Sequence, residues 1–211
     1  MNRNRLSQNF LSLKKTFIIA EISANHGGKI SNLKKLIRKC KLIGVDGVKI
    51  QTYEPDDLTI KSNKSDFKLK KDSPWSKFSN TWDLYDNAKT PDKWLKEVFA
   101  YAKKQRILIF SSPFSERAVT LLEKFQCPIY KLASPEINHI PLIEQIAKTQ
   151  KPIIISTGLA NHKDIILGIK TFRNLSNKKI ILLKCTTEYP CLYENVNLNH
   201  IIEMQKKYKV D

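Results

Sequence analysis

Polar side chains that could bind an anion follow several short apolar runs of the chain. Lysines stand at two of these places, Lys49 in GVKIQT and Lys131 in IYKLAS. Hydroxyl groups stand at the ends of four runs: Ser112, Ser134, Ser156 and Thr187. Lysine offers a point charge and hydroxyls offer neutral donors, which together suit a ligand with phosphate and carboxylate groups. Taken singly, such a hydroxyl is more often a turn residue, and a lysine can reach solvent along its stem.

Glu21 is the one carboxylate at the end of the first apolar run. It could orient a sugar hydroxyl or a metal-bound water, or it could form an ion pair with Lys49 or Lys131. Gln51 follows Lys49 by two positions, so the alternation of a strand puts both side chains on one face. The histidines are scattered and the cysteines lack zinc-ligand spacing, so no metal site and no acyl-transfer nucleophile is predicted.

The elements that must position these residues are six apolar runs, each too short for a helix and each followed by a helix-like segment. They are residues 17–23, 47–52, 107–112, 129–134, 152–157 and 180–187. Strands that alternate with helices predict a parallel α/β sheet, and polar groups at the strand ends are typical of a TIM-type (β/α) barrel. An open doubly wound sheet is the competing arrangement, but its glycine-rich GxGxxG turn is missing. We therefore expect about six of the eight βα units of such a barrel.

Boundaries and connections follow from the same pattern. Residues 1–15 are expected to form a loose tail before a partial barrel over 16–211. The segment 53–89 departs from the rhythm, and a loop of this length is usually functional or carries short structure of its own. Ser31 is the predicted N-cap of the first helix, and Thr90-Pro91 is predicted to start another, with proline at its first position.

The composition limits the class of partner and the compartment. The chain has 37 Lys+Arg against 20 Asp+Glu and a net charge of +17, which raises the question of a nucleic-acid or anionic-membrane partner. The lysines are spread along the chain without a recognisable binding module, so we expect neither partner. Cys40 and Cys127 lie in apolar settings and are predicted to be core residues. Unpaired cysteine spacing favours a reducing cytoplasm, and no apolar run approaches the length of a membrane span.

Taken in order, the motifs resemble the sialic acid synthase family. They are AEISANHGG (20–28), DGVKIQTY (46–53), FSSPF (110–114), YKLASPEI (130–137), KPIIISTG (151–158) and LLKCTTEYP (182–190). Three stretches, SANHGG, QTYEPDDLTI and WDLYDNAKTP, are most similar to the pseudaminic acid synthase branch. The resemblance covers the chain from about residue 16 to its end.

The resemblance implies a role for each matching residue. The implied ligands of phosphoenolpyruvate are Lys49, Ser112, Lys131, Ser134, Ser156 and Thr187, of which Thr187 stands where sialic acid synthases often carry Asn. Glu21 and Gln51 match positions that face the sugar, and Phe114 and Tyr189 match aromatic walls of the pocket. Glu21, Lys49 and Lys131 are the implied catalytic residues.

The implied reaction joins phosphoenolpyruvate to an amino-sugar aldehyde, giving a nonulosonic acid and phosphate. The implied sugar is 2,4-diacetamido-2,4,6-trideoxy-altrose, and N-acetylneuraminate and legionaminate synthases are the alternatives within the family. The family uses a divalent metal, Mn or Mg, whose histidine ligands are expected beyond residue 211, with the last two βα units and a C-terminal antifreeze-like domain. A homodimer is implied for the full-length enzyme, and this chain alone is expected to be inactive.

Two readings of other kinds remain open. Lys131 or Lys49 could form a Schiff base in a class I aldolase barrel. Alternatively, the chain could be a basic, non-catalytic binding protein whose affinity for its partner falls steeply with salt.

Overall fold

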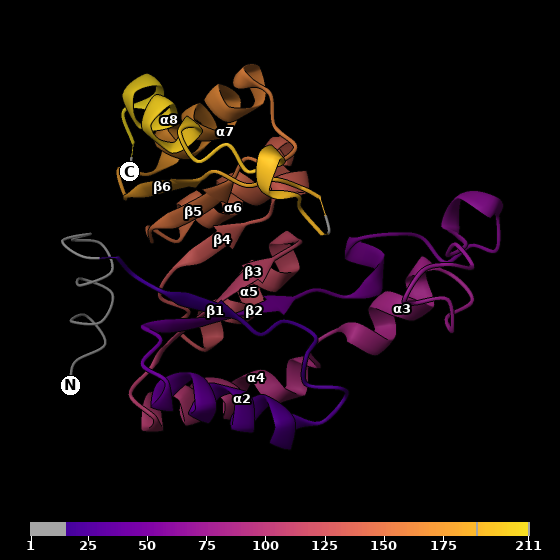
Figure 1. The fold of residues 1–211 in the computed structure, drawn as a ribbon. Coiled ribbons are helices and arrows are strands. Elements are labelled where there is room, and N and C mark those ends of the chain that lie inside the picture. The colour runs from indigo at the N-terminus through magenta and orange to yellow at the C-terminus, as the bar shows by residue number, and fades with distance from the viewer. Residues whose placement is uncertain (1–15, 189, 211) are drawn as a thin grey trace. The chain divides into compact units, whose positions relative to one another are not determined.

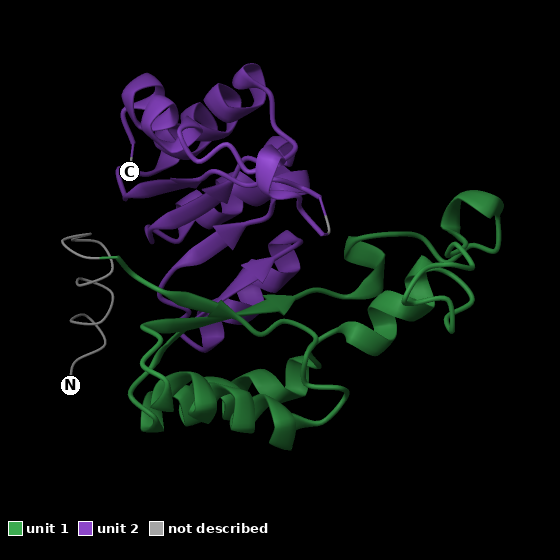
Figure 2. Cartoon of the chain, viewed as in Figure 1, with its two compact units in different colours: residues 1–109 green, residues 110–211 purple. Residues whose placement is uncertain are grey.

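The computed structural model describes residues 16–188 and 190–210, so the predicted tail over residues 1–15 lies outside the described residues. The chain divides into two compact units, residues 1–109 and residues 110–211 (Figure 2). Each unit has its own strands, helices and buried core. In each, the order of the strands follows their order in the chain.

Unit 1 is built on two parallel strands, β1 (Ile19–Glu21) and β2 (Gly47–Thr52), joined by helix α2 (Ile30–Leu42). Ile19 aligns with Gly47 and Glu21 with Lys49. Val48 and Ile50 of β2 are fully buried, because aliphatic side chains on this face of the strand leave water. This βαβ unit agrees with the predicted one.

Helices α2 and α4 (Asp92–Lys104) pack on each other in unit 1 (Figure 1). The helix α2 buries Leu33, Ile37 and Cys40 at helical spacing, so the prediction of Cys40 as a core residue is confirmed. The predicted N-cap Ser31 is wrong, because α2 already begins at Ile30 after Lys29, which makes no side-chain cap bond. The preceding loop closes instead through Asn32, whose side-chain amide donates to the His26 carbonyl at 3.1 Å.

The start of α4 is one residue later than predicted. Pro91 is the N-cap of this helix and not its first residue, and the preceding Thr90 is 2% exposed. Pro91 has a non-helical ψ of 131°, so the helix begins only at Asp92 and Thr90 lies outside its cap. The predicted helix itself is present.

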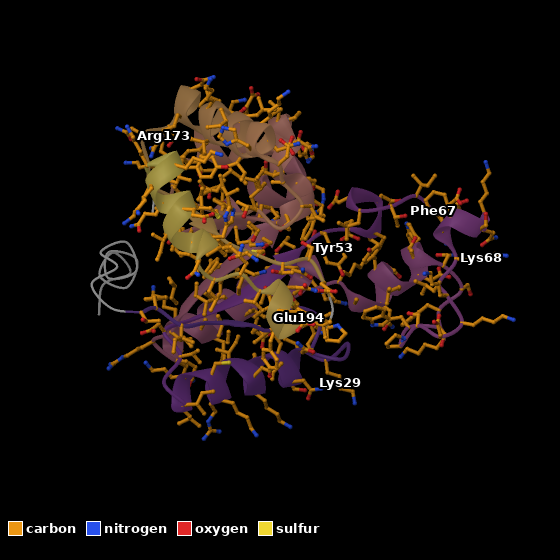
Figure 3. All side chains as sticks on the ribbon, turned by 45° about the horizontal axis from the view of Figure 1, so that its top comes forward. Lys29, Tyr53, Phe67, Lys68, Arg173 and Glu194 are labelled. Atoms are coloured by element: carbon orange, nitrogen blue, oxygen red, sulfur yellow. The ribbon has the colours of Figure 1, made fainter. Side chains whose placement is uncertain are left out.

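The segment between β2 and α4 carries two 3-10 turns, η1 (Pro55–Asp57) and η2 (Ser65–Phe67), and helix α3 (Thr81–Ala88). The indole Nε1 of Trp82 donates to Asp56 at 3.0 Å, which ties α3 to η1. Phe67 and Lys68, labelled in Figure 3, lie in this segment between β2 and α4. The prediction that segment 53–89 has short structure of its own is therefore confirmed.

Unit 2 contains the remaining strands, which pair in parallel: β3 (Leu108–Pro113, crossing the unit boundary), β4 (Tyr130–Leu132), β5 (Ile153–Ser156) and β6 (Ile180–Leu183). Tyr130 aligns with Ile153, and Ile153 aligns with Ile180. The strands β3 and β5 are wholly buried, as expected for the interior of a parallel sheet covered on both faces.

The connections in unit 2 are helical. They are α5 (Glu116–Lys124), η3 (Ser134–Asn138), α6 (Ile140–Lys148), α7 (His162–Leu175), η4 (Tyr193–Asn195) and α8 (His200–Tyr208). The helix α6 packs between α5 and α7 (Figure 1). Its Leu142, Ile143 and Ile146 are fully buried at helical spacing.

Over residues 16–188 and 190–210 the chain therefore has six strands that alternate with helices, and the strand pairs within each unit are parallel. This is the predicted βα repeat of a TIM-type fold. In the same part of the chain no helix has the length and apolar character that crossing a membrane requires.

Candidate active site

In unit 1, Glu21 at the carboxyl end of β1 lies beside Lys49 in the middle of β2. They occupy aligned positions on the two strands, and the Lys49 ammonium forms an ion pair with Oε2 of Glu21. The Lys49 side chain is 11% exposed and that of Glu21 is 47% exposed. Of the alternatives for Glu21, the ion pair with Lys49 is therefore observed. The pair offsets the cost of removing the Lys49 charge from water.

The other carboxylate oxygen of Glu21 is held by Ser23. The backbone N–H of Ser23 donates to Oε1 at 3.0 Å, and the Ser23 hydroxyl donates to the same oxygen. Both oxygens of this half-exposed carboxylate thus have partners. Gln51, two residues beyond Lys49, is partly buried on the same strand.

Hydroxyl side chains converge on Gly158 in unit 2, just beyond the end of β5. The Gly158 N–H donates to the Ser134 hydroxyl at 3.1 Å. A Cβ atom on Gly158 would lie 2.4 Å from Oγ1 of Thr187 and 3.2 Å from Oγ of Ser134. Only a residue without a side chain fits here without displacing the neighbours.

Ser156 joins this group through a thiol. The Cys185 Sγ donates to the Ser156 hydroxyl at 3.4 Å, and the Cys185 Cβ would lie 3.1 Å from a Cβ on Gly158. We refer to Ser134, Ser156, Gly158, Cys185 and Thr187 as the hydroxyl cluster. It comes from the carboxyl ends of β4, β5 and β6, and three of its members are predicted phosphate ligands.

Lys131 and Ser112 lie on neighbouring strands of unit 2. Ser111 of β3 aligns with Tyr130 of β4, so the same parallel register carries Ser112 to the position beside Lys131. Ser112 is 1% exposed, whereas Lys131 is partly buried. Phe114, the predicted aromatic wall, is 8% exposed just beyond β3.

Glu136 is a partly buried carboxyl close to Lys131 that the predicted site omits. Burial raises the pKa of Glu136, and the nearby Lys131 charge opposes the shift. Within the described part of the chain its Oε2 is buried without a hydrogen-bond partner. A carboxyl in such surroundings holds a proton more readily than one in water.

Ser23, Gly158 and Cys185 are also absent from the sequence-based site. Ser23 follows Glu21 by two positions, a spacing at which a hydroxyl can reach a nearby acceptor. Gly158 directly follows the predicted strand end. A glycine at such a place often marks a close approach of another part of the chain, or of a ligand, to the backbone. Tyr189, the second predicted aromatic wall, lies outside the described residues.

The described residues do not supply a metal centre. No group of three or more His, Cys, Asp or Glu side chains that could hold an ion occurs over residues 16–188 and 190–210. The buried Cys127 thiol donates to the Ile129 carbonyl, and burial raises its pKa to about 12, so it is a structural thiol. It therefore lacks the thiolate character of a metal ligand or a nucleophile.

Curated relatives cover almost all of this chain. It is 41% identical over 203 residues to the pseudaminic acid synthase of Campylobacter jejuni. The matched residues make up 96% of this chain and 59% of that protein. The pseudaminic acid synthase of Helicobacter pylori is 42% identical over 193 residues, or 92% of this chain and 56% of that protein. The chain thus spans less than two thirds of the length of these relatives.

Solved structures agree on the fold. The N-acetylneuraminic acid synthetase of Leptospira borgpetersenii matches 93% of this chain and 63% of its own, with a TM-score of 0.79 and 25% identity. A DAHP synthase of Thermotoga maritima matches 90% of this chain and 48% of its own, with a TM-score of 0.63 at 13% identity. The second likeness supports the fold alone.

The family model for the NeuB family matches residues 36–211. This span covers most of the chain and includes all the strands from β2 to β6. The match agrees with the identity to the two pseudaminic acid synthases. The chain therefore belongs to the NeuB family.

Proposed function

We propose that this protein condenses phosphoenolpyruvate with an amino-sugar aldehyde to give a nonulosonic acid and phosphate. The observation that carries this proposal is the hydroxyl cluster around Gly158. It gathers hydroxyls and a close backbone approach at the carboxyl ends of three parallel strands, where enzymes of this fold bind their substrates. Family membership gives the reaction class its support.

The residues of the hydroxyl cluster suit a phosphate. Ser134, Ser156 and Thr187 provide neutral donors, and the absence of a side chain on Gly158 lets Ser134 and Thr187 lie close to the backbone there. Lys131, Ser112 and Lys49 are the further proposed ligands of phosphoenolpyruvate. A lysine can neutralise a charge on the ligand, while hydroxyls fill the remaining lone pairs.

The proposed chemistry forms one carbon–carbon bond and one carbon–oxygen bond, and it breaks the carbon–oxygen bond to the phosphate. Carbon 3 of phosphoenolpyruvate attacks the aldehyde carbon, and the aldehyde oxygen takes a proton. Water adds at carbon 2 and loses a proton. The bond between carbon 2 and the bridging oxygen then breaks, and phosphate leaves with that oxygen. In this scheme the lysines stabilise the anionic groups while positive charge develops at carbon 2. The NeuB family synthases are in general metal-dependent, but no step is assigned to a metal because the described residues supply no such centre.

The proposed sugar is 2,4-diacetamido-2,4,6-trideoxy-altrose, which would make the product pseudaminic acid. The support is the difference in identity between relatives, 41% to the pseudaminic acid synthase and 34% to the N,N'-diacetyllegionaminic acid synthase of the same Campylobacter strain. Glu21, Gln51 and Phe114 are the proposed sugar-facing residues. Tyr189 is proposed as a further one from the motif alone.

The test is phosphate release from phosphoenolpyruvate by the full-length enzyme, with this sugar and a divalent metal in water labelled with oxygen-18. We expect the label in the sugar acid and none in the phosphate, because the carbon–oxygen bond of phosphoenolpyruvate breaks. N-acetylmannosamine under the same conditions should be the poorer substrate. Label in the phosphate, or no consumption of phosphoenolpyruvate with any amino sugar, would contradict the proposal.

A Schiff-base aldolase mechanism has less support. Lys49 is an ammonium in its ion pair with Glu21, and an ammonium has no lone pair with which to attack a carbonyl. Borohydride reduction with a carbonyl substrate distinguishes the two mechanisms. A trapped adduct on Lys49 or Lys131 would favour the aldolase.

The remaining proposals concern surroundings and assembly. The cysteines of the described residues, namely Cys40, Cys127, Cys185 and Cys191, are free thiols, which supports a reducing cytoplasm. We also propose a homodimer, on the basis of family membership. Light scattering on the purified protein tests the second proposal.

A further inference from the structure

Lys49 has an anionic partner within the protein itself. Oε2 of Glu21 forms the ion pair with its ammonium, while Oε1 is bonded twice by Ser23. The lysine side chain is 11% exposed, so water can neutralise its charge only in part. A nearby anion is therefore needed whether or not a ligand is bound.

The Glu21 carboxylate is well suited to be an exchangeable anion. Its side chain is 47% exposed, so solvent can take over when the carboxylate leaves Lys49. Glu21 is the last residue of β1. Its backbone is held in place, because the next residue, Ile22, donates its N–H to the Lys49 carbonyl at 3.0 Å. Only the side chain has to move for Lys49 to accept another partner.

Ser23 determines how firmly the carboxylate stays in place. Fixing a long glutamate side chain costs roughly 1.5–2 kcal/mol of rotamer freedom, and the two bonds from Ser23 offset part of this cost. The hydroxyl bond can be removed by mutation without loss of the backbone N–H bond. Ser23 is thus a positioning residue that acts through Glu21.

We infer that Glu21, held by Ser23, occupies Lys49 as an internal anion and competes there with the anionic ligand. This inference rests on the proposed function, in which Lys49 binds phosphoenolpyruvate. Binding then replaces the ion pair between Lys49 and Glu21 with one between Lys49 and the ligand. The affinity reflects the difference in free energy between these two ion pairs. The competition lowers the affinity for phosphoenolpyruvate but keeps the buried ammonium paired at every stage.

The experiment is isothermal titration calorimetry of the full 211-residue chain. It measures the dissociation constant of phosphoenolpyruvate, and that of inorganic phosphate as a simpler anion. We expect Glu21→Gln to bind phosphoenolpyruvate about two- to fivefold more tightly, the range that a half-exposed ion pair is worth. Ser23→Ala should shift the affinity in the same direction by a smaller factor. Ser23→Thr restores a hydroxyl and should return the affinity to that of the original chain.

Two controls separate competition at Lys49 from a general charge effect. Glu97→Gln makes the same change of charge in unit 1, at an ion pair with Lys34 on the helices, and should leave the affinity unchanged. In a Lys49→Met background, Glu21→Gln should no longer tighten binding. Circular dichroism of each variant checks that it remains folded.

The outcomes distinguish this inference from the proposed function. Equal or weaker binding by Glu21→Gln, or equal tightening in the Lys49→Met background, overturns the inference while the binding function stands. Absence of phosphoenolpyruvate binding by the original chain overturns both. Tightening that needs both Lys49 and the loss of the Glu21 charge supports both.

Discussion

The close packing at Gly158 predicts that a single added methyl group disturbs the hydroxyl cluster. In Gly158→Ala the new Cβ would lie 2.4 Å from Oγ1 of Thr187 and 3.1 Å from Cβ of Cys185. Rotation of the threonine side chain can relieve the first contact. The second contact involves Cβ of Cys185, which is attached directly to the backbone. Relieving it requires a shift of the backbone just beyond β5 or β6.

The expected magnitude combines two opposing effects. Overpacking of this kind costs about 1–3 kcal/mol. A glycine-to-alanine change also reduces the freedom of the unfolded chain, which stabilises the folded state by about 0.4–1 kcal/mol. We therefore expect Gly158→Ala to lower the free energy of unfolding by up to about 2.6 kcal/mol.

Urea unfolding followed by far-UV circular dichroism measures this change. Tryptophan fluorescence is less suitable, because Trp75, Trp82 and Trp94 all belong to unit 1. Gly47→Ala is the matched control, since its Cβ would meet Leu108 at 3.4 Å, an ordinary contact. It should be tolerated better than Gly158→Ala.

A second variant tests the cause. Thr187→Ala removes the closest atom, so the double variant should lose less stability than the sum of the two single variants, by at least about 0.5 kcal/mol. Strict additivity would refute the contact with Thr187. A stability gain in Gly158→Ala of the usual glycine-to-alanine size would refute the close packing itself.

Three further predictions concern buried polar groups. Burial lowers the pKa of His26 below its usual 6.5, so its contribution to stability is present above pH 6.5 and lost as the pH falls below it. His26→Asn, which keeps an acceptor for the Gly28 N–H, should show a smaller drop in Tm between pH 7.5 and 5; an equal drop would contradict this. Burial raises the pKa of Glu136, so stability present at pH 4.5 is lost as the pH rises, and Glu136→Gln should lose less by pH 7 in urea unfolding; parallel pH profiles would count against it. The buried Tyr130 hydroxyl donates to Glu123, which is also paired with Lys151, so Tyr130→Phe should cost about 1.5–3 kcal/mol in urea unfolding, and a neutral effect would show that the bond contributes little.

The strands could be predicted because their signal is local. Runs such as ILIFSS and PIIIST are continuous apolar segments with turn residues behind them, and β3 and β5 coincide with them to within one residue at each end. Helix starts were predicted less well. Ser31 looks like a cap, yet α2 begins earlier, since the side chain of Asn32 closes the loop on His26.

The site could be predicted in part, for a similar reason. The hydroxyls stand at or just beyond strand ends, which a parallel arrangement brings to one edge of a sheet, whereas the lysines lie within their strands. The choice of Lys49 over Lys131 as the partner of Glu21 depends on the register of β1 with β2, which the sequence does not encode locally. Gly158 and Cys185 depend in the same way on the register of β5 with β6.

The central claim is that the strand ends of this chain bind phosphoenolpyruvate. A titration followed by backbone amide NMR tests it most directly, because the Gly158 N–H lies within the proposed phosphate site. We predict saturable shifts of the amide signals of Ser134, Ser156, Gly158 and Thr187, with loss of saturation in Lys131→Ala. Shifts confined to the lysine-rich residues 61–71, or weak shifts spread over the surface that vanish with salt, would contradict the claim and favour a basic binding protein instead.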